Sequence, residues 1–273
     1  MENAINELKN NIKNKSYKDI NSLLSNINYY NKDKNIDSLI ETLINDSRKN
    51  VSSLGLKIKK NFENIEKEVE RVNKLYEFDK SFGEYTYIAG VDEVGRGPLA
   101  GPIVACAVIL DLNVLEEEHI LGLNDSKKLS EKKREELAKI IKEKALAYCI
   151  YESSNDEIDE KGIAFSNNKV FLESCNNLRI KPDLVLSDGY LVKNINIPNK
   201  SVIKGDTKSA SIAAASIVAK VYRDNLMREY AKEYPSYGFE ENAGYGTLKH
   251  IESIKKNGLC KIHRKSFLTK ILT

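Results

Sequence analysis

An apolar segment that ends in two adjacent carboxylates constrains the fold of this chain more than any other feature of its sequence. Residues 87–92 have the composition of a β-strand, Asp92 and Glu93 stand at its end, and a glycine-rich basic loop follows from Gly95. A strand interior normally excludes charge, because an unpaired buried carboxylate costs enough free energy to shift its pKa or to recruit a cation. Two carboxylates in a row therefore predict a positively charged partner.

Strand geometry limits how both carboxylates can serve one site. Successive side chains point to opposite faces, so Asp92 and Glu93 meet one ligand only where the strand stops, bulges or contributes a backbone carbonyl. Gly95 and Gly97 supply such a break, since glycine adopts backbone conformations closed to other residues. We therefore expect chemistry at this strand end. The alternative is a strand edge whose acids pair with Arg96.

This region resembles the first signature of ribonuclease HII, the type 2 ribonuclease H family, in the run GVDEVGRGPLAGPIV at residues 90–104. The resemblance extends over about residues 85–268 and leaves residues 1 to about 80 outside it. It implies a ribonuclease H-like α/β fold, a mixed five-stranded sheet flanked by helices. Further segments occur in the family's order: NDSKKLS at 124–130, LSDG at 186–189, KGD at 204–206, AAASIVAKVYRD at 213–224, YPSYGF at 234–239 and HRKSF at 263–267.

The pattern of apolar residues predicts two domains. Residues 1–80 lack proline and show helical periodicity, so we expect an α-helical N-terminal extension there and a catalytic domain with C-terminal helices at 81–273. The junction is expected at residues 79–83, where a helical pattern gives way to a β pattern. The extension is interpreted as a helical bundle or a helix packed on its own catalytic domain. The alternative is a docking module for nucleic acid or a protein partner.

Composition excludes several classes of protein. The formal net charge of +3 is too small to indicate a nucleic-acid binder by itself. Four cysteines stand far apart without a Cys-x-x-Cys pair, which argues against a zinc site and against a disulfide framework. No basic start precedes an apolar stretch, and nowhere do about 18 apolar residues follow one another. We expect a cytoplasmic protein with no membrane segment.

The residues beyond the junction alternate between strand and helix patterns. Three consecutive strands come first, and the later strands are connected by helices. This order predicts a sheet with an antiparallel part and a parallel part. Ser130 is expected to cap the first helix of this region. The expected strands are residues 87–92, 103–110, 145–151, 184–187 and 201–204, and the expected helices are residues 131–144, 163–178 and 209–233.

Acidic residues end or follow three of these strands. Asp92, Asp188 and Asp206 stand at strand ends, where open α/β sheets bind ligands, so we expect them to converge with Glu93. Two carboxylates 4 Å apart repel by about 4 kcal/mol at an effective dielectric of 20, so such a cluster needs cations. Oxygen ligands select Mg²⁺ or Mn²⁺ over zinc. The family resemblance implies that Asp92, Glu93 and Asp188 bind the metal and that Asp206 completes the catalytic carboxylates.

The expected activity follows from these roles. The resemblance implies an endoribonuclease that hydrolyses the RNA strand of RNA/DNA hybrids and nicks duplex DNA 5′ to embedded ribonucleotides, leaving 3′-hydroxyl and 5′-phosphate ends. Two bound metals would activate water and stabilise the leaving oxygen. One alternative is a non-catalytic RNA/DNA hybrid-binding protein on the same fold. Another is a DNA-directed nuclease on a related sheet.

Substrate recognition is expected from the main chain of Gly95, Arg96 and Gly97, whose polar groups lie beside the predicted metals. Telling RNA from DNA requires a probe of the 2′-hydroxyl, and the resemblance implies that this loop contacts the ribonucleotide. A tight turn stabilised by Pro98 is the alternative. Lys127, with Lys128, precedes a helix start and forms a candidate phosphate cradle.

Tyr245 matches the tyrosine that in the family stacks on the sugar beside the scissile phosphate. The alternative interpretation is that Tyr245 is buried in a cluster with Tyr237 and Phe239. Asp224 is interpreted as the helical partner of Arg228 at i+4 rather than as a group behind the metal ligands. His250 and His263 are interpreted as packing residues. A second group of residues forms either a basic surface or a solvated charged face: Lys204, Lys208, Lys220 and Arg223.

Overall fold

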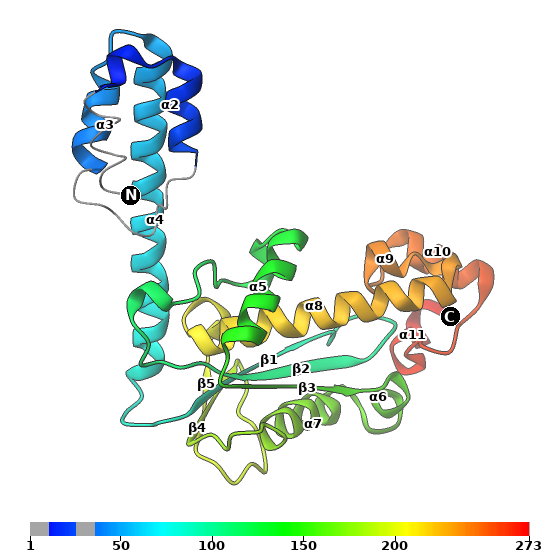
Figure 1. Ribbon diagram of the computed structural model, residues 1–273. Coiled ribbons are helices and arrows are strands. Elements are labelled where there is room, and N and C mark those ends of the chain that lie inside the picture. Colours follow the sequence, from blue (N-terminus) through cyan, green and yellow to red (C-terminus); the bar gives the residue numbers. More distant parts are fainter. Residues whose placement is uncertain (1–10, 26–35, 273) are drawn as a thin grey trace. The chain divides into compact units, whose positions relative to one another are not determined.

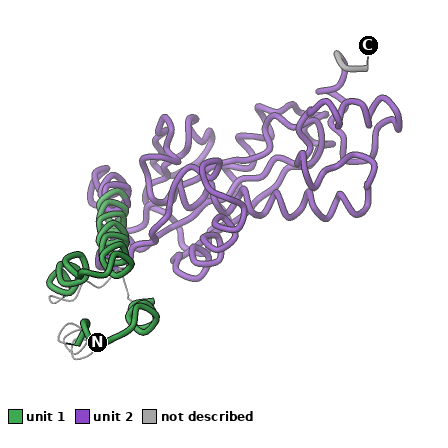
Figure 2. The backbone as a smooth tube through the Cα atoms, turned by 90° about the horizontal axis from the view of Figure 1, so that it is seen from above, with its two compact units in different colours: residues 1–71 green, residues 72–273 purple. Residues whose placement is uncertain are grey.

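The chain forms two compact units. The structure, a computed structural model, describes residues 11–25 and 36–272. Contacts divide the chain into Met1–Arg71 and Val72–Thr273, which Figure 2 shows in different colours. In the described part of the chain, no helix is both long enough and apolar enough to cross a membrane.

The first unit is helical, as expected. It contains α2 (Tyr17–Leu24), α3 (Ile36–Ile44) and the first part of α4 (Lys49–Lys80). Ser16 caps α2 by accepting a hydrogen bond from the Asp19 amide. Apolar side chains spaced at helical intervals form its core. Ile5 and Leu8 continue this spacing in the sequence and lie outside the described residues. The core includes Ile20, Leu39, Ile40, Leu43, Val51 and Phe62.

The second unit is built on a mixed sheet with the strand order β3-β2-β1-β4-β5. The first three strands pair antiparallel, whereas β4 pairs parallel with both β1 and β5. This arrangement confirms the expected mixed five-stranded sheet and places β1 at its centre. The strands are β1 (Ile88–Val94), β2 (Ile103–Ile109), β3 (Ala147–Ser153), β4 (Leu184–Asp188) and β5 (Asn199–Val202).

Helices cover both faces of this sheet (Figure 1). The helix α8 lies against β1 and β2 with α5 packed on it, and α7 covers the opposite face. The helix α5 has the predicted bounds, and the Ser130 side chain caps it by accepting from the Lys133 amide. The helices are α5 (Glu131–Lys144), α6 (Asn155–Lys161), α7 (Ile163–Asn176), α8 (Ala210–Glu233), α9 (Phe239–Asn242), α10 (Leu248–Asn257) and α11 (Lys265–Leu272).

A glycine allows α8 to approach the central strand closely. A Cβ atom on Gly90 would lie 2.1 Å from the carbonyl carbon of Ser211, a distance that no side chain tolerates. Small residues on α8 complete this contact, since Ala213, Ala214 and Ala215 are all buried. The close approach brings Ser216 of α8 beside Asp92 of β1.

Candidate active site

The carboxyl ends of two neighbouring strands bring Asp92 and Asp188 together. The last residues that β1 and β4 pair are Val91 and Ser187, so Asp92 and Asp188 come next along parallel strands. Neighbouring strands lie about 4.8 Å apart, which makes these two side chains close neighbours. The positions of these acids in the sequence predict this convergence.

Asp92 is buried on the face that α8 covers. Only 7% of the residue is exposed, and its Oδ1 accepts a hydrogen bond from the Glu93 amide at 2.8 Å. Burial raises the pKa of Asp92 well above its usual range, and the charges of Glu93 and Asp188 raise it further. A hydrogen bond with the Ser216 side chain opposes this rise.

Glu93 interacts electrostatically with Asp92 and Asp188, although successive side chains of a strand point to opposite faces. Burial raises its pKa to about 7, the charge of Asp188 adds to this rise, and the Arg96 guanidinium opposes it from 4.0 Å. The predicted strand end at residue 92 is wrong, because β1 stays paired with β2 through Val94. The neighbouring strand β4 ends here, and its last residue, Asp188, lies near both Asp92 and Glu93.

Asp206 reaches the site from the turn after β5. Asp188 Oδ1 accepts a hydrogen bond from the Gly205 amide at 2.6 Å, which fixes the start of this turn. The preceding residue, Lys204, is left-handed with φ 56°, so the chain reverses there. Burial raises the pKa of Asp206, and the charges of Asp188 and Asp125 raise it further. All four predicted carboxylates therefore lie in one region.

The donor chemistry of this region fits a divalent cation. Oxygen ligands suit Mg²⁺ and Mn²⁺. Burial first, and then the charges of neighbouring carboxylates, raise the pKa values of Asp92, Glu93 and Asp206. Within residues 11–25 and 36–272, no three His, Cys, Asp or Glu side chains are arranged as a ready-made metal site. The carboxylates repel one another, so we expect their side chains to approach one another only when a cation is bound between them.

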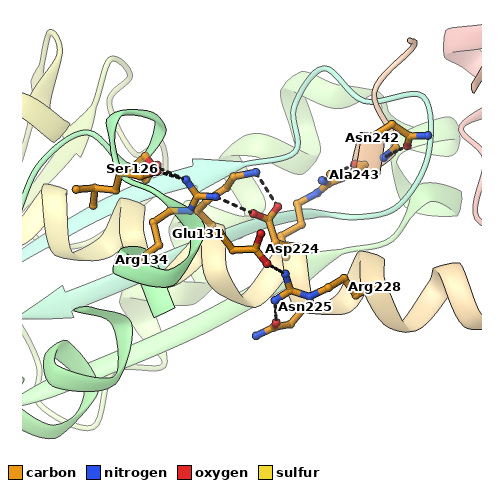
Figure 3. A network of polar contacts seen from close by, with 12 residues as sticks. Ser126, Glu131, Arg134, Asp224, Asn225, Arg228, Asn242 and Ala243 are labelled. Carbon is orange, nitrogen blue, oxygen red and sulfur yellow. Dashed lines mark hydrogen bonds and ion pairs between the residues drawn. The ribbon is translucent and has the colours of Figure 1, made fainter. Parts of the chain in front are cut away.

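Lys127 lies on a short loop, and Arg134 of α5 contacts this loop at the Ser126 carbonyl (Figure 3). The loop is the 3-10 turn Ser126–Lys128, in which the Asp125 side chain accepts from the Lys127 amide. Arg134 Nη1 donates to the carbonyls of Ser126 at 3.1 Å and Leu129 at 2.6 Å. The charge of Lys127 lowers the pKa values of both Glu93 and Asp206, so the lysine reaches the carboxylate region.

Asp224 has other partners than the sequence predicted. It pairs with Lys220 at 2.6 Å, one turn earlier in α8, and with Arg134 of α5 at 3.8 Å. Arg228, the predicted partner, instead contacts Glu131, Glu135 and Asn225 (Figure 3). Asp224 therefore supports the Lys127 loop through Arg134.

The segment 95–102, called the glycine loop below, follows the two adjacent acids. Gly95 has φ +89°, and a Cβ atom there would lie 2.2 Å from the Arg223 Nε, so only glycine fits. At Gly97 the nearest atom to such a Cβ position is the Tyr245 Cε1 at 3.9 Å. Tyr245 is 43% exposed and is thus not buried in a cluster.

Two buried arginines are functional candidates that sequence reasoning missed. Arg223 was predicted on a basic or solvated surface, but it is fully buried and donates to the carbonyls of Ala100, Pro102 and Ala243. Arg264 is equally buried and binds the other end of the glycine loop. The sequence offers no signal for this burial, since Arg223 stands between Lys220 and Asp224, and Arg264 stands between His263 and Lys265.

The two C-terminal histidines follow the packing interpretation, and two of the three remaining lysines lie at the surface. His250 and His263 are buried and contact each other through their Nε2 atoms at 3.1 Å. Lys204 and Lys208 are exposed, whereas Lys220 is half-buried in its pair with Asp224.

Comparison with known proteins supplies the family. The family described as Ribonuclease HII matches residues 89–270, and the Ribonuclease HII N-terminal domain matches residues 16–83. Ribonuclease HII of Clostridium beijerinckii is 72% identical over 249 residues, covering 91% of this chain and 92% of that protein. Ribonuclease HII of Clostridium perfringens strain 13 is 58% identical over the full length of both chains.

Solved structures share the fold of the second unit. The ribonuclease H2 of Pyrococcus horikoshii OT3 has a TM-score of 0.58 at 28% identity, covering 68% of this chain and 96% of its own. A chain of the PCNA:RNase HII complex of Archaeoglobus fulgidus has a TM-score of 0.57 at 26% identity, covering 68% of this chain and 97% of its own. Enzymes of this type are metal-dependent hydrolases that degrade RNA in RNA/DNA hybrids. The chain belongs to the ribonuclease HII family and is a metal-dependent endoribonuclease.

Proposed function

We propose that this chain, besides degrading RNA in hybrids, nicks duplex DNA on the 5′ side of embedded ribonucleotides and leaves 3′-hydroxyl and 5′-phosphate ends. The observation that carries the proposal is the adjacency of Asp92 on β1 and Asp188 at the end of β4, one position beyond the last pair of these parallel strands. The glycine loop follows directly on β1, so a group that can inspect a sugar lies beside the groups that hold metals.

Asp92, Glu93 and Asp188 are the proposed metal ligands, and Asp206 is the fourth catalytic carboxylate. Mn²⁺ or Mg²⁺ is the proposed ion, and a structure of Bst-RNase HIII, which shares the fold at 20% identity and a TM-score of 0.55, is a complex with Mn²⁺. When bound, two such ions lower the pKa of the attacking water and stabilise the departing 3′ oxygen. Burial raises the pKa values of Asp92 and Glu93, and the charge of Asp188 raises them further. A bound cation would offset both effects, which supports this assignment.

The chain's own groups bind and orient the substrate. Lys127, which is exposed on the loop near Asp206, is proposed to hold a phosphate oxygen. The main chain of Gly95, Arg96 and Gly97 is proposed to contact the 2′-hydroxyl. Tyr245, exposed beside Gly97, is proposed to stack on the neighbouring sugar.

A labelled DNA duplex with one ribonucleotide tests this function directly. We expect a single nick on the 5′ side of the ribonucleotide with Mn²⁺ or Mg²⁺, and no product in EDTA or on an all-DNA duplex. Asp92→Asn and Asp188→Asn should abolish the nick and keep the fold. Glu116→Gln, an exposed acid remote from the strand ends in sequence, should not change it. Undiminished turnover in both aspartate variants contradicts the metal assignment, and binding without product contradicts the nicking activity.

A further inference from the structure

Arg264 donates hydrogen bonds to three carbonyls of the glycine loop from a fully buried position. Its Nε binds the Gly101 oxygen at 2.8 Å, its Nη1 the Arg96 oxygen at 3.2 Å and its Nη2 the Gly95 oxygen at 2.6 Å. In the described part of the chain no acid forms an ion pair with it. Burial lowers its pKa to about 9, so the guanidinium remains charged at neutral pH.

These bonds determine where two neighbouring N–H groups point. The described chain contains no cis peptide bond, and in a trans peptide the N–H points opposite to the carbonyl. Since the Gly95 and Arg96 carbonyls point to Arg264, the N–H groups of Arg96 and Gly97 point away from it. Neither N–H has a hydrogen-bond partner among the described residues. Two consecutive donors are therefore free on one side of the loop.

The free donors lie next to the candidate site. The Arg96 guanidinium is 4.0 Å from Glu93 Oε1, and Gly97 faces the Tyr245 ring. Successive backbone N–H groups form a concavity that binds an oxygen atom. A ribonucleotide offers such an oxygen at its 2′ position, and a deoxyribonucleotide does not.

We propose that Arg264 is the positioning residue for ribonucleotide recognition, because it aims the N–H groups of Arg96 and Gly97 at the 2′-oxygen. This inference rests on the proposed function. A deoxyribose leaves both donors without an acceptor, so discrimination depends on how firmly the donors are held. The planar guanidinium reaches three carbonyls at once, whereas a lysine ammonium carries the same charge on a flexible stem.

Arg223 provides a matched control. It is equally buried, and its three donors bind the Ala100, Pro102 and Ala243 carbonyls at 2.9 to 3.1 Å. It therefore holds the later part of the glycine loop. It also packs against Gly95, but it donates to neither the Gly95 nor the Arg96 carbonyl. Arg223→Lys and Arg264→Lys remove comparable hydrogen bonds, and only the second releases the two donors.

The experiment measures affinity for labelled duplexes with one ribonucleotide or none, in an Asp92→Asn background that prevents turnover. We expect Arg264→Lys to reduce the ratio of the two affinities about tenfold. Arg223→Lys should leave that ratio within about twofold, although both substitutions lower the melting temperature. An equal change in both variants, or no change in Arg264→Lys, overturns the inference.

Two further outcomes keep this test decisive. If Arg264→Lys does not fold, Gly97→Pro removes one of the two N–H donors directly, and an unchanged affinity ratio then overturns the inference. The Asp92→Asn parent must itself prefer the ribonucleotide duplex. A parent without that preference contradicts the proposed recognition by the glycine loop, whereas a preference that survives in Arg264→Lys contradicts the role of Arg264 alone.

Discussion

Asp79, in the last turn of α4, is a buried carboxylate that binds the first turn of α8 and lies outside the candidate site. Its Oδ2 accepts a hydrogen bond from the Ser211 amide at 2.9 Å, and its Oδ1 has no partner among the described residues. Burial raises its pKa from 3.8 to about 6, against the opposing effect of hydrogen bonds from Ser209, Ala210 and Ser211. The folded chain therefore keeps a proton on Asp79 at a pH where the unfolded chain has lost it.

This raised pKa predicts a pH-dependent stability. The contribution of Asp79 is fully present below about pH 4 and is lost as the pH rises to about 6, because the unfolded chain then binds fewer protons than the folded chain. A shift of about two units corresponds to about 3 kcal/mol. Asp79→Asn stays neutral, so its free energy of unfolding should rise relative to the parent between pH 4 and pH 7. Urea titrations at both pH values measure this difference, and a constant difference contradicts the raised pKa.

Tyr245 is expected to act on the substrate and not on the metal. Stacking of an aromatic ring contributes about 1–3 kcal/mol, so Tyr245→Ala should reduce kcat/KM at a single embedded ribonucleotide roughly tenfold or more. The affinity for Mn²⁺, measured by calorimetry, should not change. Tyr148→Ala removes a similarly exposed ring from β3 and serves as the control. Equal losses of cleavage and metal affinity would place Tyr245 in a structural role.

At the scale of elements, two arginines join α5 and α8 with different consequences. Arg134 is 15% exposed and binds two carbonyls of the Lys127 loop together with Asp224. Arg228 is 32% exposed and binds acids of α5 that are themselves 48–62% exposed. The first set of contacts is largely shielded from water, so its loss should cost more than the loss of the second.

Arg134→Met is therefore expected to lower the free energy of unfolding by about 1–3 kcal/mol, because two carbonyls and a carboxylate lose their donor. It should also raise KM, since the loop with Lys127 loses its support. Arg228→Met should change stability by less than about 1 kcal/mol. Urea unfolding and steady-state kinetics measure both effects. Similar values for the two variants would contradict the supporting role of Arg134.

The sequence predicts the sheet and the longer helices of the second unit well, because their apolar periodicity and caps are strong. It misses α6, in which Ile158 is the one buried residue of an acidic segment. The signal was the cap at Ser154, which accepts from the Glu157 amide. The predicted strand 201–204 is displaced from β5, because Ile203 is 74% exposed and Lys204 is left-handed.

The convergence of the four carboxylates follows from strand order and is therefore predictable. The burial of Arg223 and Arg264 is not predictable, because arginine normally lies at the surface and the neighbouring residues do not mark these two as buried. Likewise, the partners of Asp224 depend on how α5 packs on α8, and spacing along one helix does not contain that information.

At the scale of the whole molecule, the boundary between the units decides which fragment is stable. The predicted boundary lies at residue 80, whereas the contacts divide the chain after Arg71. Val72, Leu75 and Tyr76 are buried in the core of the second unit, on the face of the sheet that α8 covers. We propose that these last turns of α4 belong to the catalytic unit.

Two fragments test this boundary. Both 72–273 and 81–273 contain every candidate site residue, so each is expected to cleave if it folds. The shorter fragment loses three buried apolar side chains, each contributing about 1.5–3 kcal/mol, and should be less stable by about 5 kcal/mol. Urea unfolding and the single-ribonucleotide assay measure both properties. If the two fragments are equally stable, the boundary lies at residue 80 as the sequence predicts. If fragment 72–273 folds but does not cleave, the first unit contributes to the site.

The hydrogen bond between Arg264 and Gly95 joins residues 169 positions apart. A chain leaving the ribosome thus completes β1 and its acids long before the guanidinium that holds the neighbouring loop has been synthesised. The four acids and the guanidinium that holds the neighbouring loop are consequently synthesised at different moments of translation. From the proposed role of Arg264, we expect a chain truncated before this residue to carry all four acids and to lack discrimination between the two kinds of sugar.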